Sequence, residues 1–375
     1  MLNENLKWSQ YDFSKIPFSD IVRFGQRTLL YRDLFTVSWL LGRYCNYKCS
    51  YCWPYAHTTK KDHRPTELCL KTIDEIKRQA RQNGFNSFHF SLSGGEPTFH
   101  PGYLDILKYL ADDVENTNHT SIHMTSNCSR PLSWFKTYIN YAKPFHRASI
   151  TASLHTEHVA TAEDLDAFAT KLEYCQSYDV QVTVNMVMVP DWFERDWENA
   201  LYLHERGINV TLKPQSDPTA SRVVDGYTPL QLKTLHNGMP QRAYTEKKRI
   251  WANRPKPKFT VPESHKDNSI IPAHFQVEFE DSTGKKWYMD QAERFNAFNF
   301  NKFKGWLCNS GYQGIIIREP DGNIKRSYSC HDKPLGHIET GFKLFDKPTL
   351  CKTESCVSSA DSKLPKSKIS LDQPK

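Results

Sequence analysis

The chain has 375 residues, of which 38 % are hydrophobic and 13 % aromatic, enough to form the core of one large domain and one small one. It contains no run of 18 apolar residues and no signal-like N-terminus, so we expect a cytoplasmic protein with no membrane partner. The net charge of +7 is modest and does not by itself indicate nucleic-acid binding. Ten cysteines in such a protein favour metal or redox chemistry over disulfides.

Residues 1–33 are expected to be an N-terminal extension, and the apolar run at 34–41 predicts the first buried strand. Three cysteines follow this strand in the spacing CxxxCxxC, which chance would give only roughly 0.007 times in such a chain. Three thiolates can hold three irons of a four-iron cubane and leave the fourth iron open. A zinc site with His57 as a fourth ligand is the alternative. The cysteines are Cys45, Cys49 and Cys52.

The next segment predicts a helix over about 65–83, with Pro65 in its first turn and Gly84 at its end. A strand at 87–92 then leads into the sequence Ser-Gly-Gly-Glu-Pro at 93–97. Glycines without side chains let backbone groups approach a ligand closely, although Gly-Gly before Pro is by itself typical of a simple turn.

Strands and helices continue to alternate through the middle of the chain, which implies parallel strands. The predicted strands cover 119–125, 148–155, 180–189 and 208–213, and the predicted helices cover 132–141, a segment starting at 161, and 191–206. In parallel barrels the chemistry lies at the carboxyl ends of the strands. The polar residues expected there are Ser126, Asn127, His155 and Lys213.

A second group of cysteines lies near the C-terminus. Asp-Gly at 321–322 predicts a hairpin between the runs 314–318 and 323–328, which brings two of these cysteines to its ends. Four thiolates can fully ligate a second iron–sulfur cluster, and structural zinc or unligated thiols are the alternatives. The group is Cys308, Cys330, Cys351 and Cys356.

Three remaining regions carry weaker signals. Residues 216–300 fit no motif but include a basic, aromatic stretch at 242–258, which suits either an anionic partner or a solvated surface, and a predicted hairpin at 275–289. The polar tail 358–375 is expected to be disordered. Cys69 and Cys175 lie on helical patterns and are expected to be core residues.

The order of strand, cysteine loop, helix, strand and GGEP resembles that of radical S-adenosylmethionine (radical SAM) enzymes, from about residue 30 to about residue 215. This resemblance implies the α/β class, with a partial (β/α)6 TIM-like barrel over 34–215. The second cysteine group resembles the twitch or SPASM domain of some of these enzymes, which implies a small C-terminal α+β auxiliary-cluster domain over 301–357. Its spacing departs from the usual pattern, because the gap from Gly322 to Cys330 is longer and the last pair is CxxxxC. The glycine-rich pattern at the sixth strand is also absent.

The resemblance implies roles for individual residues. S-adenosylmethionine would bind the open iron through its amino and carboxylate groups. His155 is a candidate to orient substrate or move a proton, although it is equally typical of a structural histidine. Cys128 is a candidate to return a hydrogen atom to the substrate, although it is more typical of a packed core thiol. The residues expected around the cofactor are Tyr51, Gly94, Gly95, Glu96, Pro97, Ser126, Asn127, Ser153 and Asn185.

The expected function is therefore that of a radical SAM enzyme. It would cleave S-adenosylmethionine reductively to a 5′-deoxyadenosyl radical, which abstracts a hydrogen atom from a small polar molecule such as a sugar, an aminocyclitol or a nucleotide-like compound. A reductant such as flavodoxin or ferredoxin would supply the electron, and an auxiliary 4Fe–4S cluster would assist oxidation or relay electrons. About 30 residues precede the first strand, too few for an N-terminal peptide-binding domain. A peptide-modifying enzyme (RiPP maturase), an RNA-modifying enzyme and an iron–sulfur electron-transfer protein are the alternatives.

Overall fold

The computed structural model describes residues 18–53, 58–218, 222–240, 277–289, 300–318, 321–356 and 358–368. His57, the alternative zinc ligand, and the basic stretch 242–258 lie outside these ranges. Within them, no helix has the length and apolar content needed to cross a lipid bilayer.

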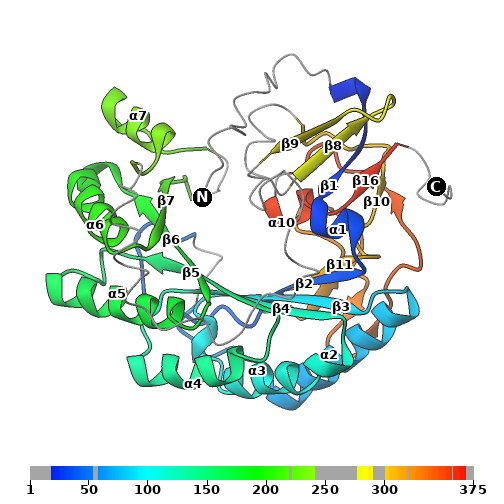
Figure 1. Cartoon of the computed structure of the whole chain (residues 1–375), viewed down its shortest axis with the longest axis horizontal. Coiled ribbons are helices and arrows are strands. Elements are labelled where there is room, and N and C mark those ends of the chain that lie inside the picture. The colour runs from blue at the N-terminus through cyan, green and yellow to red at the C-terminus, as the bar shows by residue number, and fades with distance from the viewer. Residues whose placement is uncertain are drawn as a thin grey trace.

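Six parallel strands pair in chain order and form a curved, open sheet, which confirms the predicted partial barrel (Figure 1). The strands are β2 (Leu34–Leu40), β3 (Ser87–Ser93), β4 (His119–Ser126), β5 (Arg147–Leu154), β6 (Gln181–Met188) and β7 (Asn209–Pro214). The helices that cover the convex face are α2 (Thr66–Gln82), α3 (Tyr103–Asp112), α4 (Leu132–Ala142), α5 (Ala162–Gln176) and α6 (Phe193–Glu205). The concave face of the sheet remains on the inside of the arc.

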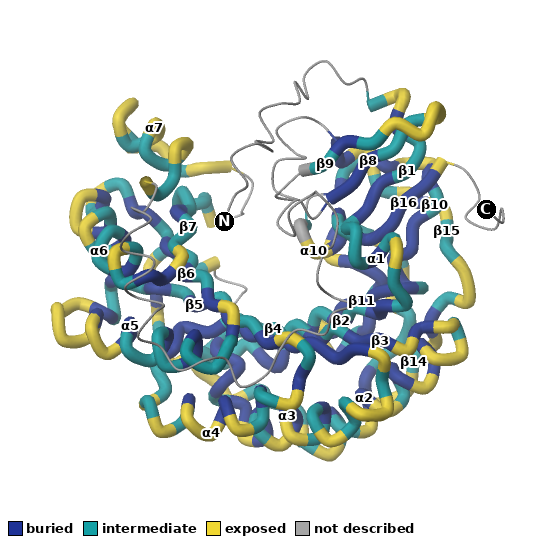
Figure 2. The backbone as a smooth tube through the Cα atoms, viewed as in Figure 1, coloured by how far each residue is buried: buried dark blue, intermediate teal, exposed yellow. Residues whose placement is uncertain are grey.

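Burial alternates along each strand, as a sheet with two different faces requires. On β5, Ala148, Ile150 and Ala152 are fully buried under the helices, whereas Ser149 and Thr151 are only partly buried on the concave face (Figure 2). The helices begin where local chemistry favours them. Thr161 and Asp164, for example, form a reciprocal capping box at the start of α5.

The sheet extends past β2 through strands from the C-terminal part of the chain. β11 (Gly314–Ile317) pairs in parallel with β2, and the predicted turn at 321–322 connects it to β12 (Asn323–Lys325). β13 (Gly336–His337) and β14 (Gly341–Phe342) complete ten strands. The direct pairing of β11 with β2 was not predicted, and Gly314 permits it, because a Cβ there would lie 2.5 Å from Oγ1 of Thr36.

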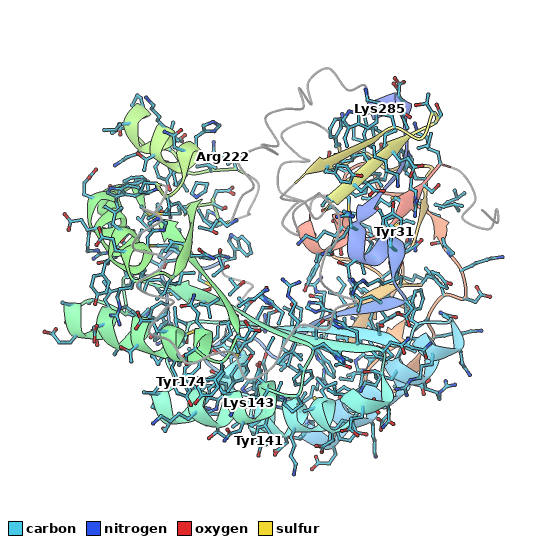
Figure 3. All side chains as sticks on the ribbon, in the orientation of Figure 1. Tyr31, Tyr141, Lys143, Tyr174, Arg222 and Lys285 are labelled. Atoms are coloured by element: carbon cyan, nitrogen blue, oxygen red, sulfur yellow. The ribbon has the colours of Figure 1, made fainter. Side chains whose placement is uncertain are left out.

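A second sheet combines segments from both ends of the described chain in the order β15-β10-β16-β1-β8-β9. Its strands are β1 (Ile21–Gln26), β8 (Val277–Asp281), β9 (Lys286–Met289), β10 (Leu307–Cys308), β15 (Thr349–Leu350) and β16 (Lys366–Ser367). The predicted hairpin at 275–289 is therefore present in its described part. Next to it, Tyr31 of α1 (Arg27–Tyr31) accepts a 2.7 Å hydrogen bond from Lys286, beside the turn that carries Lys285 (Figure 3).

The prediction of a disordered tail over 358–375 is wrong for residues 358–368. These residues form α10 (Ser359–Ser362) and β16, and β16 lies between β10 and β1. The polar composition was misleading because the polar groups are buried with partners. The Lys366 side chain is 1 % exposed and its ammonium meets backbone carbonyls. The predicted extension 1–33 likewise contributes β1 to this sheet.

The remaining short elements connect these layers. They are α7 (Pro229–Asn237) and the 3-10 helices η3 (Phe18–Asp20), η4 (Pro97–Phe99), η5 (Val114–Asn116) and η6 (Pro190–Trp192).

Candidate active site at the barrel mouth

The GGEP turn packs directly against the chain that leads into the cysteine loop. Gly95 N donates to Gly42 O at 2.9 Å, and Glu96 N donates to Tyr44 O at 2.7 Å. A Cβ on Gly95 would lie 2.2 Å from Arg43 O, a distance that no real Cβ contact shows. The glycine is thus needed for close packing of two backbone segments, whereas the sequence suggested only an approach to a ligand.

Glu96 joins this turn to the end of β4. Its side chain is 1 % exposed and accepts four hydrogen bonds. The donors are Thr98 N at 3.1 Å, Thr98 Oγ1 at 2.6 Å, Ser126 Oγ at 2.8 Å and Asn127 N at 2.6 Å. Burial raises the pKa of Glu96, and the four donors oppose that rise. Because these bonds use both carboxylate oxygens, Glu96 acts by positioning Ser126 and Asn127.

Asn127 connects β4 to the cysteine loop. Its Nδ2 donates to Asn46 Oδ1 at 3.0 Å and lies 3.9 Å from the Cys45 sulfur. The following residue, Cys128, has a φ of +54°, which is rare for a residue with a side chain. Ser126 Oγ accepts from Cys128 N at 2.9 Å and helps to hold this conformation.

The Cys128 thiol is 1 % exposed within the main hydrophobic core, and its sulfur lies 3.7 Å from Ser126 O. Burial raises the pKa of this thiol to about 12. These contacts support a packing role for Cys128, and we do not include it among the proposed catalytic groups.

The loop after β5 holds the cysteine loop from the other side. Tyr51 Oη and His155 Nδ1 are 2.8 Å apart, and their rings stack. Glu157 accepts from Ser50 N at 2.8 Å and also bonds the Ser50 hydroxyl. His158 Nε2 accepts from Lys48 N at 3.3 Å. The sequence analysis paired neither Tyr51 with His155 nor Glu157 and His158 with the loop, because nothing in one sequence shows which loops meet.

The three thiols of the loop are close enough to influence one another. Burial is the main factor that raises the pKa of Cys45 and Cys52. It also raises the pKa of Cys49 to about 12, with Glu157 and then the other two thiols contributing. Iron must therefore displace protons from these thiols when it binds. Cys49 Sγ also lies within 4.8 Å of ligand atoms of Glu157 and His158.

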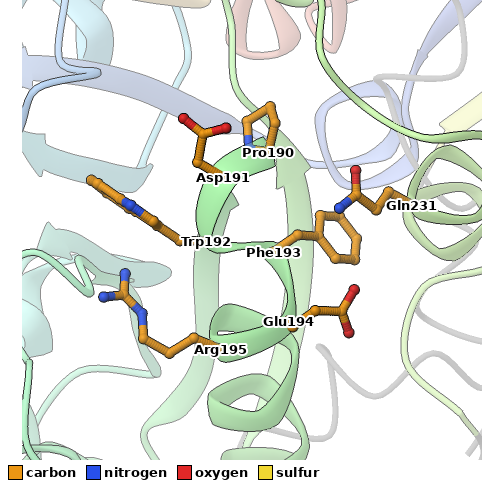
Figure 4. A pocket seen from close by; sticks show the side chains of 7 residues that line it. All are labelled: Pro190, Asp191, Trp192, Phe193, Glu194, Arg195 and Gln231. Atoms are coloured by element: carbon orange, nitrogen blue, oxygen red, sulfur yellow. The ribbon is translucent and has the colours of Figure 1, made fainter.

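The remaining predicted cofactor residues lie on neighbouring strands at this end of the barrel. Ser153 on β5 and Asn185 on β6 are directly paired, and Thr211 on β7 pairs with Asn185. A cavity of about 370 Å³ lies beyond the end of β6 (Figure 4). Its lining includes Trp192 and Arg195, whose guanidinium lies 5.0 Å from the Trp192 ring centre.

The second cysteine group converges from separate segments onto the second sheet. Cys308 lies on β10, Cys351 N donates to Trp306 O at 2.8 Å, and Cys356 N donates to Asn301 O at 2.8 Å. Cys308 and Cys330 both act electrostatically on Cys351. A cleft of about 540 Å³ lies beside these thiols, lined by Tyr328, Ser329, His331, Asp332 and residues 352–355.

Lys366 is a buried cation next to this group. Its Nζ donates to the carbonyls of Asp361 at 2.9 Å, Ser362 at 3.3 Å and Leu364 at 2.9 Å. Three acceptors match the three N–H groups of an ammonium ion. Lys366 is the cross-strand partner of Cys308, so the thiols lie next to a fixed positive charge.

Comparison with known families agrees with this geometry. Residues 39–203 match the family described as "Radical SAM superfamily". The matched residues contain most of the open parallel barrel and the three-cysteine loop at its mouth, and this part of the chain is a radical SAM domain. This domain supports the radical SAM enzyme that the sequence analysis expected.

Solved structures with a similar fold include "Native anSMEcpe with bound AdoMet", with a TM-score of 0.49 and 16 % identity over 82 % of this chain and 79 % of that one. Another is "Native anSMEcpe with bound AdoMet and Kp18Cys peptide", with a TM-score of 0.48 and 15 % identity over 82 % and 79 %. A likeness at this level says nothing about the reaction of this chain. No curated protein matches the sequence.

Proposed function

We propose that Cys45, Cys49 and Cys52 hold a 4Fe–4S cluster whose open iron binds S-adenosylmethionine. The cluster and S-adenosylmethionine, when bound, would supply a 5′-deoxyadenosyl radical, with one electron taken from a reductant such as flavodoxin or ferredoxin. This radical would abstract a hydrogen atom from a small polar substrate. The observation that carries the proposal is the match to the radical SAM family over residues 39–203, together with three mutually interacting thiols at the carboxyl end of β2.

The chain's own residues would prepare this site in two ways. Asn127 and Tyr51 fix the cysteine loop against β4 and β5, so that the thiols are oriented before iron arrives. Burial lowers the pKa of His155 to about 4, and this neutral imidazole is held by Tyr51. Ser153 and Asn185 would contact the cofactor from the neighbouring strands.

We also propose that Cys308, Cys330, Cys351 and Cys356 hold an auxiliary 4Fe–4S cluster that accepts or relays electrons. Zn–S bonds of about 2.3 Å would place tetrahedral ligands about 3.8 Å apart. Among the described residues, no three of these four sulfurs lie within 4.8 Å of one another, which suits a larger group than one ion. The neighbouring Lys366 ammonium would offset the negative charge of a thiolate-ligated cluster.

The test uses anaerobically reconstituted protein with S-adenosylmethionine and dithionite. We expect 5′-deoxyadenosine and about eight irons per chain, falling to about four irons and no 5′-deoxyadenosine in a Cys45→Ala, Cys49→Ala, Cys52→Ala variant. Cys175→Ala, which removes a buried core thiol outside both groups, is the matched control. A fully loaded wild-type protein that forms no 5′-deoxyadenosine would contradict the proposal and favour an electron carrier.

A further inference from the structure

The turn after β5 brings two metal-ligating side chains against the thiol of Cys49. One ligand atom each from Cys49, Glu157 and His158 lies within 4.8 Å of the other two. Among the described residues, neither the three loop thiols nor the second cysteine group brings three such atoms this close together. Holding the cysteine loop requires hydrogen-bond acceptors on this turn, but it does not require ligand atoms that converge on a thiol.

The three side chains suit a single divalent ion. Tetrahedral Zn²⁺ has bonds of about 2.3 Å to sulfur and about 2.0–2.2 Å to nitrogen and oxygen, which places its ligand atoms about 3.4–3.6 Å apart. Because the three atoms are already within 4.8 Å of one another, a closure of roughly 1 Å would be enough. A thiolate and a carboxylate balance the charge of the ion, a neutral imidazole is the third ligand, and water would take the fourth position.

Other contacts hold the two side chains of the turn in place. The His158 ring stacks on the Tyr47 ring, with centroids 4.0 Å apart and an interplanar angle of 9°. The Glu157 carboxylate accepts two hydrogen bonds from Ser50, which leaves about two of its four lone-pair positions for an ion. Supports of this kind orient the ligands of metal sites. Cys49 is buried, but Glu157 and His158 are partly exposed, so an ion can reach them from solvent.

One hydrogen bond opposes metal binding, and it is weak. His158 Nε2 accepts from Lys48 N at 3.3 Å. A metal on Nε2 would replace this contact directly, and a metal on Nδ1 would break it by moving the ring proton to Nε2. The distance exceeds the usual range of about 2.7–3.2 Å, so little is lost. Lys48 is exposed, and water can therefore accept from its N–H instead.

We propose that Cys49, Glu157 and His158 bind one divalent ion, Zn²⁺ or Fe²⁺, in the cluster-free protein, with release of the Cys49 thiol proton to solvent. In the proposed cubane the same sulfur binds one iron, so the single ion and the cluster compete for it. Sites with mixed nitrogen, oxygen and sulfur ligands generally hold Zn²⁺ more tightly than Fe²⁺, so zinc bound here should block cluster assembly. This competition rests on the proposed function, whereas the single-ion site does not.

The first experiment measures Zn²⁺ binding to metal-free, full-length protein under anaerobic conditions, by competition with a chromophoric chelator. Cys49→Ala and His158→Gln should each weaken one zinc site about 100-fold or more, because loss of an outer-shell partner alone costs about 10–100-fold. Cys45→Ala and exposed His236→Ala are the matched controls and should bind zinc as the wild type does. Zinc at the second cysteine group is common to all these proteins and cancels in the comparison. Unchanged binding in His158→Gln, or an equal loss in Cys45→Ala and Cys49→Ala, would overturn the inference.

The second experiment measures iron uptake during reconstitution, with and without the zinc concentration that saturates the wild-type site. Without zinc, His158→Gln should take up iron as the wild type does, which shows that its cysteine loop is intact. With zinc, the wild type should lose about four irons per chain more than His158→Gln loses. Equal losses in the two proteins would refute the competition. Wild-type protein that binds zinc through His158 but forms no 5′-deoxyadenosine after iron loading would support the single-ion site and refute the proposed function.

Discussion

Replacing Gly95 by alanine should destabilise the barrel mouth without changing any functional side chain. The new Cβ would lie 2.2 Å from Arg43 O and 2.3 Å from Tyr44 O, both of them backbone atoms that cannot rotate away. Separating the two segments would strain or break the hydrogen bonds from Gly95 N and Glu96 N. An overpacked contact costs about 1–3 kcal/mol and each of the two lost hydrogen bonds about 0.5–1.5 kcal/mol, so we expect a loss of about 2–6 kcal/mol.

The assay is urea unfolding under anaerobic conditions, combined with the iron content after reconstitution. Gly284→Ala is the matched control, because Gly284 lies in the β8–β9 turn, where an added methyl group would meet nothing within 4 Å and only the φ of +83° opposes alanine. Gly95→Ala should lose more stability than the control and should also retain less iron at Cys45, Cys49 and Cys52. Equal losses in the two variants, with full iron content in both, would refute the argument that backbone packing here positions the cysteine loop.

Three further predictions concern single side chains. Lys366→Met should lower the reduction potential of the proposed auxiliary cluster by roughly 90 mV in an EPR-monitored titration, the effect of removing one charge about 8 Å away at an effective dielectric of about 20. The exposed Lys368→Met variant should leave the potential unchanged. Burial lowers the pKa of His100 to about 4, so as the pH falls the unfolded protein takes up this proton before the folded protein does. The free energy of unfolding should therefore decrease as the pH is lowered from about 6.5 to about 4. His100→Gln should reduce the slope of this decrease by up to about 1.4 kcal/mol per pH unit in urea titrations. Glu157→Gln weakens the bonds to Ser50 and should speed iron release to a chelator about tenfold, and an unchanged rate relative to exposed Glu115→Gln would contradict this.

The sequence was sufficient for the features that depend on local chemistry. The strands β2 to β7, the start of the helix at 161 and the turn at 321–322 follow from short-range patterns, and all are present. The cysteine loop and GGEP could be placed at one end of the barrel because parallel strands bring their carboxyl ends together.

The features that sequence analysis missed depend on contacts between distant segments. Glu157 meets Ser50 across 107 residues, and Gly314 of β11 pairs with Thr36 of β2, 278 residues earlier. The C-terminal segment was misjudged for the same reason. Lys366 looks like a solvated residue in the sequence, but its three carbonyl acceptors come from the short helix α10 and the residue Leu364 after it, whose packing no local pattern reveals.

The arrangement of the second sheet has a consequence for biogenesis. Strands β2 to β7 come from one uninterrupted stretch and can assemble while later residues are still being synthesised. The other sheet cannot close until β16 at 366–367 inserts between β10 and β1. The surroundings of Cys308 and its partners are therefore complete only when residues 366–367 are available, and a nascent chain that lacks them would carry strands β2 to β7 beside an incomplete second sheet.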